Sequence, residues 1–114
     1  LIVVSDTFVE FADPLMRQLD YPTLFCHSLE VDENNRIVGY KLRQKDPKRQ
    51  VIKALKSLNY SVIAFGDSYN DVSMLQEADK AFLYKPPQNV INDYPDFPVG
   101  TSYQEMKYLL QSMF

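Results

Sequence analysis

Two aspartates four residues apart, Asp67 and Asp71, follow an apolar segment that ends at Gly66. The apolar segment is typical of a buried strand, and the residues after Asp71 are typical of a helix. Magnesium ions prefer oxygen ligands and are usually held by one or two carboxylates together with a substrate phosphate. With Asn70 between the aspartates, the pattern predicts a metal site. The alternative is a helix start capped by Asn70 or Ser68, with Asp71 complementing the helix dipole.

A second polar cluster, Ser5-Asp6-Thr7, directly follows the apolar run at the start of the chain. A hydroxyl group and exposed backbone N–H groups at a strand-to-helix turn are suited to bind a phosphate oxygen. The same three residue types also occur in ordinary helix caps, which is the alternative interpretation.

A third candidate is Lys48, which follows Asp46-Pro47, a cap residue with a first-turn proline. A cation in the first turn of a helix is disfavoured by the helix dipole, by a few tenths to about 1 kcal/mol. An anion bound at that helix start would offset this cost. The alternative is a tolerated surface lysine.

Apolar patterns along the chain predict strands that alternate with helices, which favours an α/β fold with a mainly parallel sheet. The segments on either side of residues 32–35 are predicted to form an antiparallel hairpin. A proline-rich loop near the end is predicted to contain one helical turn, at residues 89–92. The expected strands are residues 1–4, 24–31, 36–42, 60–65 and 81–84; the expected helices are 8–19, restarting at Pro14, then 47–58, 72–78 and 103–113.

Composition narrows the functional classes. The 114 residues suffice for one small domain, and 46% hydrophobic residues argue against disorder. The net charge of −3 is spread along the chain, which predicts no nucleic-acid-binding stripe and no membrane-binding segment. The single cysteine, Cys26, excludes an internal disulfide and fits a cytoplasmic location. A catalytic dyad of Cys26 and His27 is excluded, because neighbouring side chains of a strand point to opposite faces. We expect Cys26 to be an apolar filler and His27 a surface residue.

The three clusters together resemble motifs II, III and IV of the haloacid dehalogenase superfamily, and most closely its phosphoserine phosphatases. Segments 5–8, 14–19, 42–50 and 66–71 are similar to the bacterial dual-function phosphoserine phosphatase/homoserine kinase branch. The resemblance covers nearly the whole chain. It implies a Rossmann-like core with helices on a mainly parallel sheet and a β-hairpin insert, with residues 1–114 as the C-terminal part of one domain.

The resemblance also implies roles around a transferring phosphoryl group. Ser5 and the backbone N–H of Asp6 would bind this group, and Lys48 would neutralise its charge. Asp67 would ligate Mg²⁺ directly, Asp71 would contact the ion indirectly or through water, and Asn70 would orient the phosphate or ligand. The implied substrate is a small phosphorylated amino acid, O-phospho-L-serine, with Mg²⁺ as cofactor and homoserine as a second phosphoryl acceptor. A homodimer is one alternative for the oligomeric state.

The family's nucleophile is missing from these residues. It is the first aspartate of an Asp-x-Asp motif on the first strand of the core, and a helical cap follows it. The nearest candidates, Asp32 and Asp93, do not follow an apolar strand. We therefore expect the chain to be the C-terminal portion of a longer protein, with the missing strand between those that end at Ser5 and Asp67. Alone, it is expected to fold poorly and to be inactive.

Two alternatives from other classes are a truncated, non-catalytic module that binds phosphate and Mg²⁺, and a receiver-type signalling domain. Lys85-Pro86 invites the second comparison. A receiver places its acceptor aspartate well before its threonine and lysine, whereas Asp67 precedes Lys85 by only 18 residues. The spacing therefore argues against a receiver.

Overall fold

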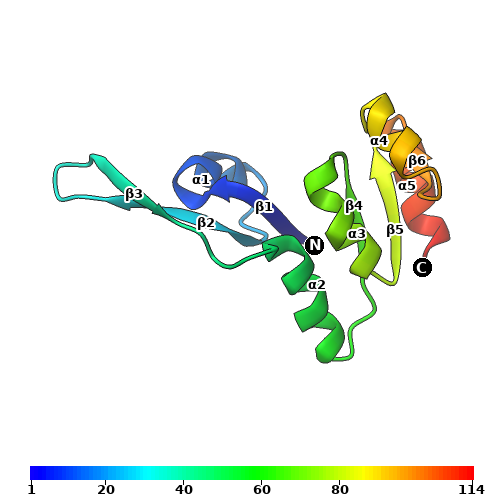
Figure 1. Cartoon of the computed structure of the whole chain (residues 1–114), viewed down its shortest axis with the longest axis horizontal. Coiled ribbons are helices and arrows are strands. Elements are labelled where there is room, and N and C mark those ends of the chain that lie inside the picture. Colours follow the sequence, from blue (N-terminus) through cyan, green and yellow to red (C-terminus); the bar gives the residue numbers. More distant parts are fainter. The chain divides into compact units, whose positions relative to one another are not determined.

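The computed structural model describes residues 1–114, and the chain divides into two compact units, Leu1–Val51 and Ile52–Phe114. The boundary lies inside helix α2 (Pro47–Ser57), and each unit contains one three-stranded sheet (Figure 1). None of the helices has the length and hydrophobicity needed to span a bilayer. The mixture of parallel strands and helices confirms the predicted α/β class.

The first unit has a mixed sheet in the order β1-β2-β3, in which β1 is an end strand. Strands β1 and β2 are parallel, whereas β2 and β3 are antiparallel. Its elements are β1 (Ile2–Phe8), α1 (Val9–Gln18), β2 (Thr23–Val31), β3 (Ile37–Lys41) and the start of α2.

The predicted hairpin is confirmed, and β2 and β3 form a long two-stranded ribbon in Figure 1. Its turn is closed by Asp32, whose Oδ1 accepts hydrogen bonds from the backbone N–H groups of Asn34 and Arg36, both at 2.9 Å. Asn35 has a φ of 58°, a left-handed conformation that asparagine adopts more readily than most residues. The turn residues therefore explain why the chain reverses here.

Helix α1 differs from its prediction in two ways. It is continuous from Val9 to Gln18 with Pro14 inside it, instead of restarting at Pro14. The apolar stripe that predicts this helix, which includes Phe11 and Leu15, is expected to face the core, but both side chains are more than half accessible. The buried residues are Ala12 and Met16 instead. The small Ala12 and the unbranched Met16 are four residues apart, so they share one helix face that lies against the unit.

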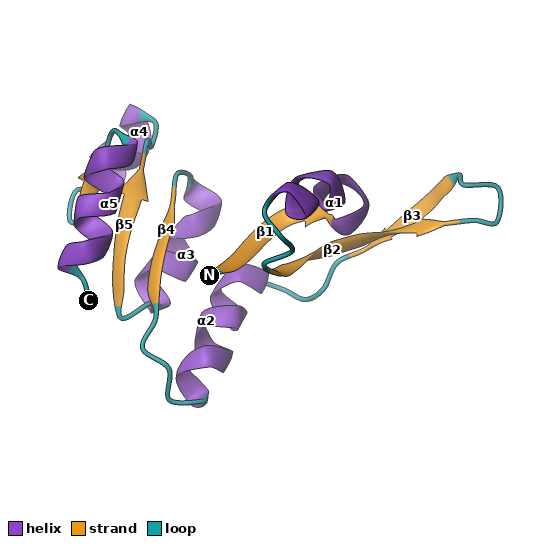
Figure 2. Cartoon of the chain, turned by 180° about the vertical axis from the view of Figure 1, so that it is seen from behind, coloured by secondary structure: helices purple, strands orange, loops and turns teal.

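The second unit has a wholly parallel sheet in the order β4-β5-β6, in which β4 is an end strand. Helix α3 lies against β4 and β5, and α5 lies against β6 (Figure 2). The elements after α2 are β4 (Ile63–Gly66), the 3₁₀ turn η1 (Tyr69–Asp71), α3 (Val72–Glu77), β5 (Lys80–Tyr84), α4 (Gln88–Asp93), β6 (Val99–Gly100) and α5 (Tyr103–Ser112).

Most of these elements were predicted, with two differences. Strand β4 begins at Ile63 instead of Tyr60, whose side chain is exposed. Strand β6 was predicted as part of the proline-rich loop, and it has only two residues, too few to show a pattern in the sequence. It is held in place by backbone hydrogen bonds in which Leu83 donates to Pro98 and Lys85 donates to Gly100, both at 2.8 Å.

The core of the second unit lies around β5. Phe82 and Leu83 are fully buried, and the Phe82 ring stacks on that of Phe65 with the ring centroids 5.1 Å apart. Leu75 of α3 and Val90 of α4 are also buried almost completely. The central strand therefore carries apolar side chains on both faces, as expected for a parallel strand covered by helices.

A polar clamp fixes the start of β4. The Asp79 carboxylate accepts a hydrogen bond from the Val62 N–H at 2.8 Å and lies 3.2 Å from the Lys56 ammonium group. Lys56 also donates to the Glu77 carbonyl at 3.0 Å. The pKa of Asp79 is lowered, chiefly by the Val62 hydrogen bond and then by that of Lys56. Because β4 leads directly to Asp67, the clamp helps to position the metal-site candidate.

Candidate active site

The Ser5-Asp6-Thr7 cluster lies at the end of β1, and not in a turn after it. The strand continues to Phe8, and its pairing with β2 becomes irregular between Val4 and Phe8. Within this irregular stretch the Thr7 N–H donates to Ser5 Oγ at 3.2 Å. Because Oγ accepts this bond, the hydroxyl proton of Ser5 can be directed to another acceptor.

Lys48 is one of the few buried charged residues, which excludes the surface-lysine alternative. Its Nζ lies 3.4 Å from Oδ2 of Asp6. The helix dipole disfavours the positive charge of Lys48, and the first turn of α2 contains no acidic residue that could offset this cost. The Asp6 carboxylate of β1 is the opposite charge near Lys48. Asp46, the expected cap, has a φ of 49° instead of the extended conformation usual for a cap residue. The structure thus brings Asp6 and Lys48 together.

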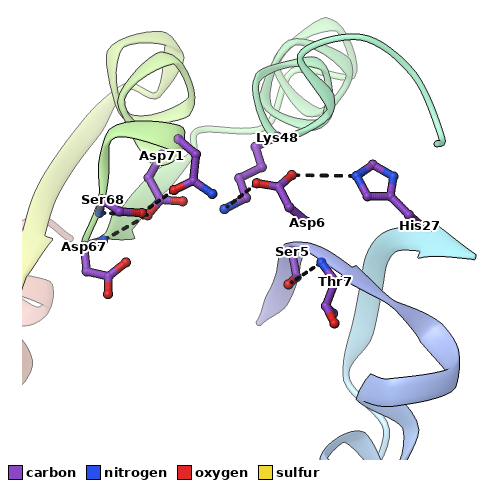
Figure 3. Close-up of polar contacts among 9 residues, drawn as sticks. Ser5, Asp6, Thr7, His27, Lys48, Asp67, Ser68 and Asp71 are labelled. Carbon is purple, nitrogen blue, oxygen red and sulfur yellow. Dashed lines mark hydrogen bonds and ion pairs between the residues drawn. The ribbon is translucent and has the colours of Figure 1, made fainter.

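His27 was predicted to be a surface residue, and this prediction is wrong: only 7% of it is exposed. His27 lies opposite Phe8 because β2 pairs with β1. This pairing cannot be read from the sequence of β2 alone. Its Nδ1 accepts a hydrogen bond from the Arg43 N–H at 3.1 Å, and its Nε2 lies 3.8 Å from Oδ1 of Asp6. In Figure 3 the Asp6 carboxylate lies between the Lys48 ammonium group and the imidazole.

Cys26 is half-buried, as expected for an apolar filler. Burial raises the pKa of its thiol, and the nearby Glu10 carboxylate raises it further. A thiol with a raised pKa is a poor nucleophile. The raised pKa favours the interpretation of Cys26 as an apolar filler over that of a nucleophile.

In the second unit, Asp71 closes the loop after β4. Its buried carboxylate accepts hydrogen bonds from the N–H groups of Asp67 and Ser68, at 3.0 and 3.2 Å, and from the Ser68 hydroxyl at 3.3 Å (Figure 3). The single proton of the Ser68 hydroxyl is shared between this carboxylate and Oδ1 of Asn70. These contacts match the capping alternative, and they also fix the backbone that carries Asp67.

Gly66 is required by this loop, because the Asp71 carboxylate packs directly on it. A Cβ atom at position 66 would lie 2.5 Å from both Cγ and Oδ2 of Asp71. No carbon atom fits at that distance, so any side chain at position 66 would displace the carboxylate. The glycine that ends β4 therefore also leaves room for Asp71.

The Asp67 side chain is exposed, and its carboxylate accepts no hydrogen bond and forms no ion pair. In Figure 3 it points away from the Asp71 carboxylate. The two aspartates are therefore not paired ligands of one ion. An exposed carboxylate with solvent around it nevertheless fits Mg²⁺, which retains several water ligands. Residues 1–114 contain no group of three or more histidine, cysteine or acidic side chains that could hold a metal ion.

Tyr69 has a positioning role that the sequence reasoning missed. Its hydroxyl donates to the Asp93 carboxylate of α4, and its ring meets that of Tyr94 edge-on with centroids 6.2 Å apart. The hydrogen bond to Asp93 raises the pKa of Tyr69. The sequence does contain a signal for this contact, because Tyr69 is an aromatic residue among the polar residues of a loop. Such a ring usually needs a packing partner.

Comparison with known proteins gives a consistent family. The family model of haloacid dehalogenase-like hydrolases matches residues 1–79. The chain is 57% identical to phosphoserine phosphatase ThrH of Pseudomonas aeruginosa over 107 residues, which is 94% of this chain and 52% of that protein. The chain spans about half the length of the curated relatives it matches.

Solved structures show the same fold. A probable phosphoserine phosphatase from Vibrio cholerae superposes with a TM-score of 0.76 at 17% identity, covering 97% of this chain and 36% of that one. A phospho-aspartyl intermediate analogue of phosphoserine phosphatase superposes with a TM-score of 0.72 at 18% identity, covering 97% and 55%. At these identities the structures support the fold alone.

Proposed function

Because the chain belongs to the haloacid dehalogenase-like hydrolase family, we propose that it is the C-terminal part of a phosphatase core that hydrolyses O-phospho-L-serine. The observation that carries the proposal is the buried Lys48 ammonium group, 3.4 Å from Asp6 at the end of β1. The amino-acid substrate follows from the 57% identity to a protein named as a phosphoserine phosphatase.

The first unit would bind the phosphoryl group. The Ser5 hydroxyl, the backbone N–H of Asp6 and the Lys48 ammonium group are the donors at the end of β1. A cation held in a largely buried position interacts more strongly with an anion than one in water, because the surroundings screen it less. These donors would stabilise the charge that spreads over the phosphoryl oxygens during transfer.

The second unit would contribute to a Mg²⁺ site. Asp67 would be the direct ligand, Asp71 would hold the loop and contact the ion through water, and Asn70 would orient the phosphate. When bound, Mg²⁺ supplies positive charge that offsets the charge of the phosphoryl oxygens. The exposed, unpaired Asp67 carboxylate supports this assignment.

The nucleophile would be an aspartate outside residues 1–114. Its carboxylate would attack phosphorus as the bond to the serine oxygen breaks, and water would then hydrolyse the aspartyl-phosphate. The strands β1 and β4 are each an end strand of their own sheet. Each therefore has an edge with which the nucleophile strand implied by the family resemblance could pair.

The experiment is to measure phosphate release from O-phospho-L-serine by the whole protein that carries this chain, with Mg²⁺ and after its removal by a chelator. O-phospho-L-threonine and homoserine are added in parallel to test substrate choice and phosphoryl transfer. Metal-dependent turnover of phosphoserine is expected. Phosphate binding without turnover would favour the alternative of a non-catalytic module, and the 114 residues alone should be inactive.

A further inference from the structure

His27 is a buried titratable residue to which the proposed chemistry gives no role. It is the only histidine in the chain, and it lies on β2, next to the end of β1 where the phosphoryl group would bind. Its Nε2 lies 3.8 Å from Oδ1 of the Asp6 carboxylate. The position of this ring therefore bears on how Asp6 and Lys48 are arranged.

We propose that His27 is a positioning residue that holds the Asp6 carboxylate in place beside Lys48. The proposal rests on the proposed function, because it concerns the same phosphoryl site. His27 would act through Asp6 and would not touch the substrate.

The backbone determines which ring nitrogen carries the proton. The Arg43 N–H donates to Nδ1 at 3.1 Å, so Nδ1 is an acceptor and the proton of the neutral ring is on Nε2. This is the nitrogen that faces Oδ1 of Asp6. The Arg43 amide thus selects the tautomer that points an N–H toward the carboxylate. At 3.8 Å this N–H is just outside hydrogen-bond distance, and a small shift of the Asp6 side chain toward the ring would close the bond.

The two oxygens of the Asp6 carboxylate face different side chains. Oδ1 faces His27, and Oδ2 lies 3.4 Å from Lys48. The Asp6 side chain is 41% exposed, so its orientation depends on polar contacts as well as on packing. In the proposed reaction Lys48 would turn toward the phosphoryl group. His27 would then still hold one oxygen of Asp6 and keep this carboxylate from moving toward the negatively charged substrate.

A purely structural role is the competing explanation. The imidazole also packs near the Phe8 ring, with centroids 6.2 Å apart, and its bond to Arg43 fixes the segment after β3. Two substitutions separate these roles. Asn places an acceptor near the position of Nδ1 and can keep the Arg43 bond, whereas Gln reaches the position of Nε2 and can keep a donor toward Asp6.

The experiment compares His27→Asn and His27→Gln in the whole protein, with kcat and KM for O-phospho-L-serine and the inhibition constant of inorganic phosphate. We expect His27→Asn to lower kcat/KM by about ten- to a hundredfold, as for a misplaced catalytic group, and His27→Gln to retain most of it. Equal rates in the two variants, whether normal or low, would overturn the proposal, as would the opposite order.

A second readout does not depend on turnover. The ¹⁵N chemical shifts of the His27 ring in the wild-type protein should show a proton on Nε2, and Asp6→Asn should shift the Nε2 resonance while the thermal midpoint changes little. A proton on Nδ1, or an Nε2 signal that ignores the substitution, would overturn the proposal. Absence of phosphoserine turnover in the wild type would instead reject the proposed function.

Discussion

The two candidate clusters are built in different ways. In the first unit, Asp6, His27 and Lys48 come from β1, β2 and α2, and they meet through contacts between side chains. In the second unit, the residues from Gly66 to Asp71 form one short loop, held mainly by backbone N–H groups that donate to a single carboxylate. The first cluster therefore depends on tertiary packing, and the second on local sequence.

This difference indicates how each cluster should respond to change. Removing one side chain from the first cluster leaves the backbone of β1 and α2 intact, so binding should suffer more than folding. Removing a contact in the second cluster changes the path of the chain itself, so Asp67 would be displaced together with its neighbours. The following predictions test this contrast in the whole protein.

The largest effect is expected for Asp67→Asn, which removes the negative charge proposed to hold Mg²⁺. A metal ion stabilises the transition state by several kcal/mol, and losing this stabilisation corresponds to a fall in kcat of about a thousandfold. Phosphate release at increasing Mg²⁺ concentration measures it. Asp96→Asn, at another exposed aspartate, is the matched control and should change nothing. A normal Mg²⁺ response in Asp67→Asn would contradict the metal assignment.

Lys48→Ala should lower kcat/KM by about a hundredfold, as for loss of one preorganised donor to the transition state, and leave the fold intact. The exposed Lys45 provides the control, since Lys45→Ala should have a normal rate. Steady-state kinetics and circular dichroism together distinguish lost binding from lost folding. If Lys48→Ala unfolded the protein, the contrast between the clusters would be wrong.

Gly66→Ala should reduce the free energy of unfolding by about 1–3 kcal/mol, the usual cost of overpacking, because the new methyl group collides with Asp71. Denaturant titration measures the loss. At Gly39 an added Cβ would meet the flexible end of Glu30 at 2.8 Å, and that side chain can move away. Gly39→Ala should therefore cost much less, and equal losses would count against a special role for Gly66.

The smallest effect concerns acid stability at the Asp79 clamp. The pKa of Asp79 is lowered in the folded state by the Val62 N–H and by Lys56, so its carboxylate stabilises the fold at neutral pH. This contribution should be lost as the pH falls below the ordinary value of 3.8 and through the lower folded value. As the pH decreases through this range, the thermal midpoint should fall less steeply in Asp79→Asn than in the wild-type protein. An unchanged slope would argue against the clamp.

The contrast also explains what the sequence could predict. The hairpin, α2, α3, β5 and the loop at Asp67 have local signals, such as the Gly66–Asp71 spacing and the Asp46-Pro47 pair, and they were predicted close to their observed positions. The short strand β6 was missed because its two residues are defined by pairing with β5.

The missed site residues share this non-local origin. Burial of His27 results from the register of β2 against β1, and the anchoring of Tyr69 depends on α4, 24 residues further along the chain. The exposed face of α1 is a related case: the stripe of Phe11 and Leu15 identified a helix correctly, but the buried side is set by Ala12 and Met16. Periodicity predicts the helix, and only packing determines its orientation.

Pro14 inside α1 has a consequence for how this helix opens. Proline has no N–H, so the helical hydrogen bond to the Glu10 carbonyl is missing, and that end of the helix is held instead through the Glu10 carboxylate, which accepts the Leu29 N–H at 3.0 and 3.1 Å. In amide hydrogen exchange, α1 should therefore behave as two short segments with separate protection. Its second half should be protected by its own helical bonds, and its first by the attachment of Glu10 to β2.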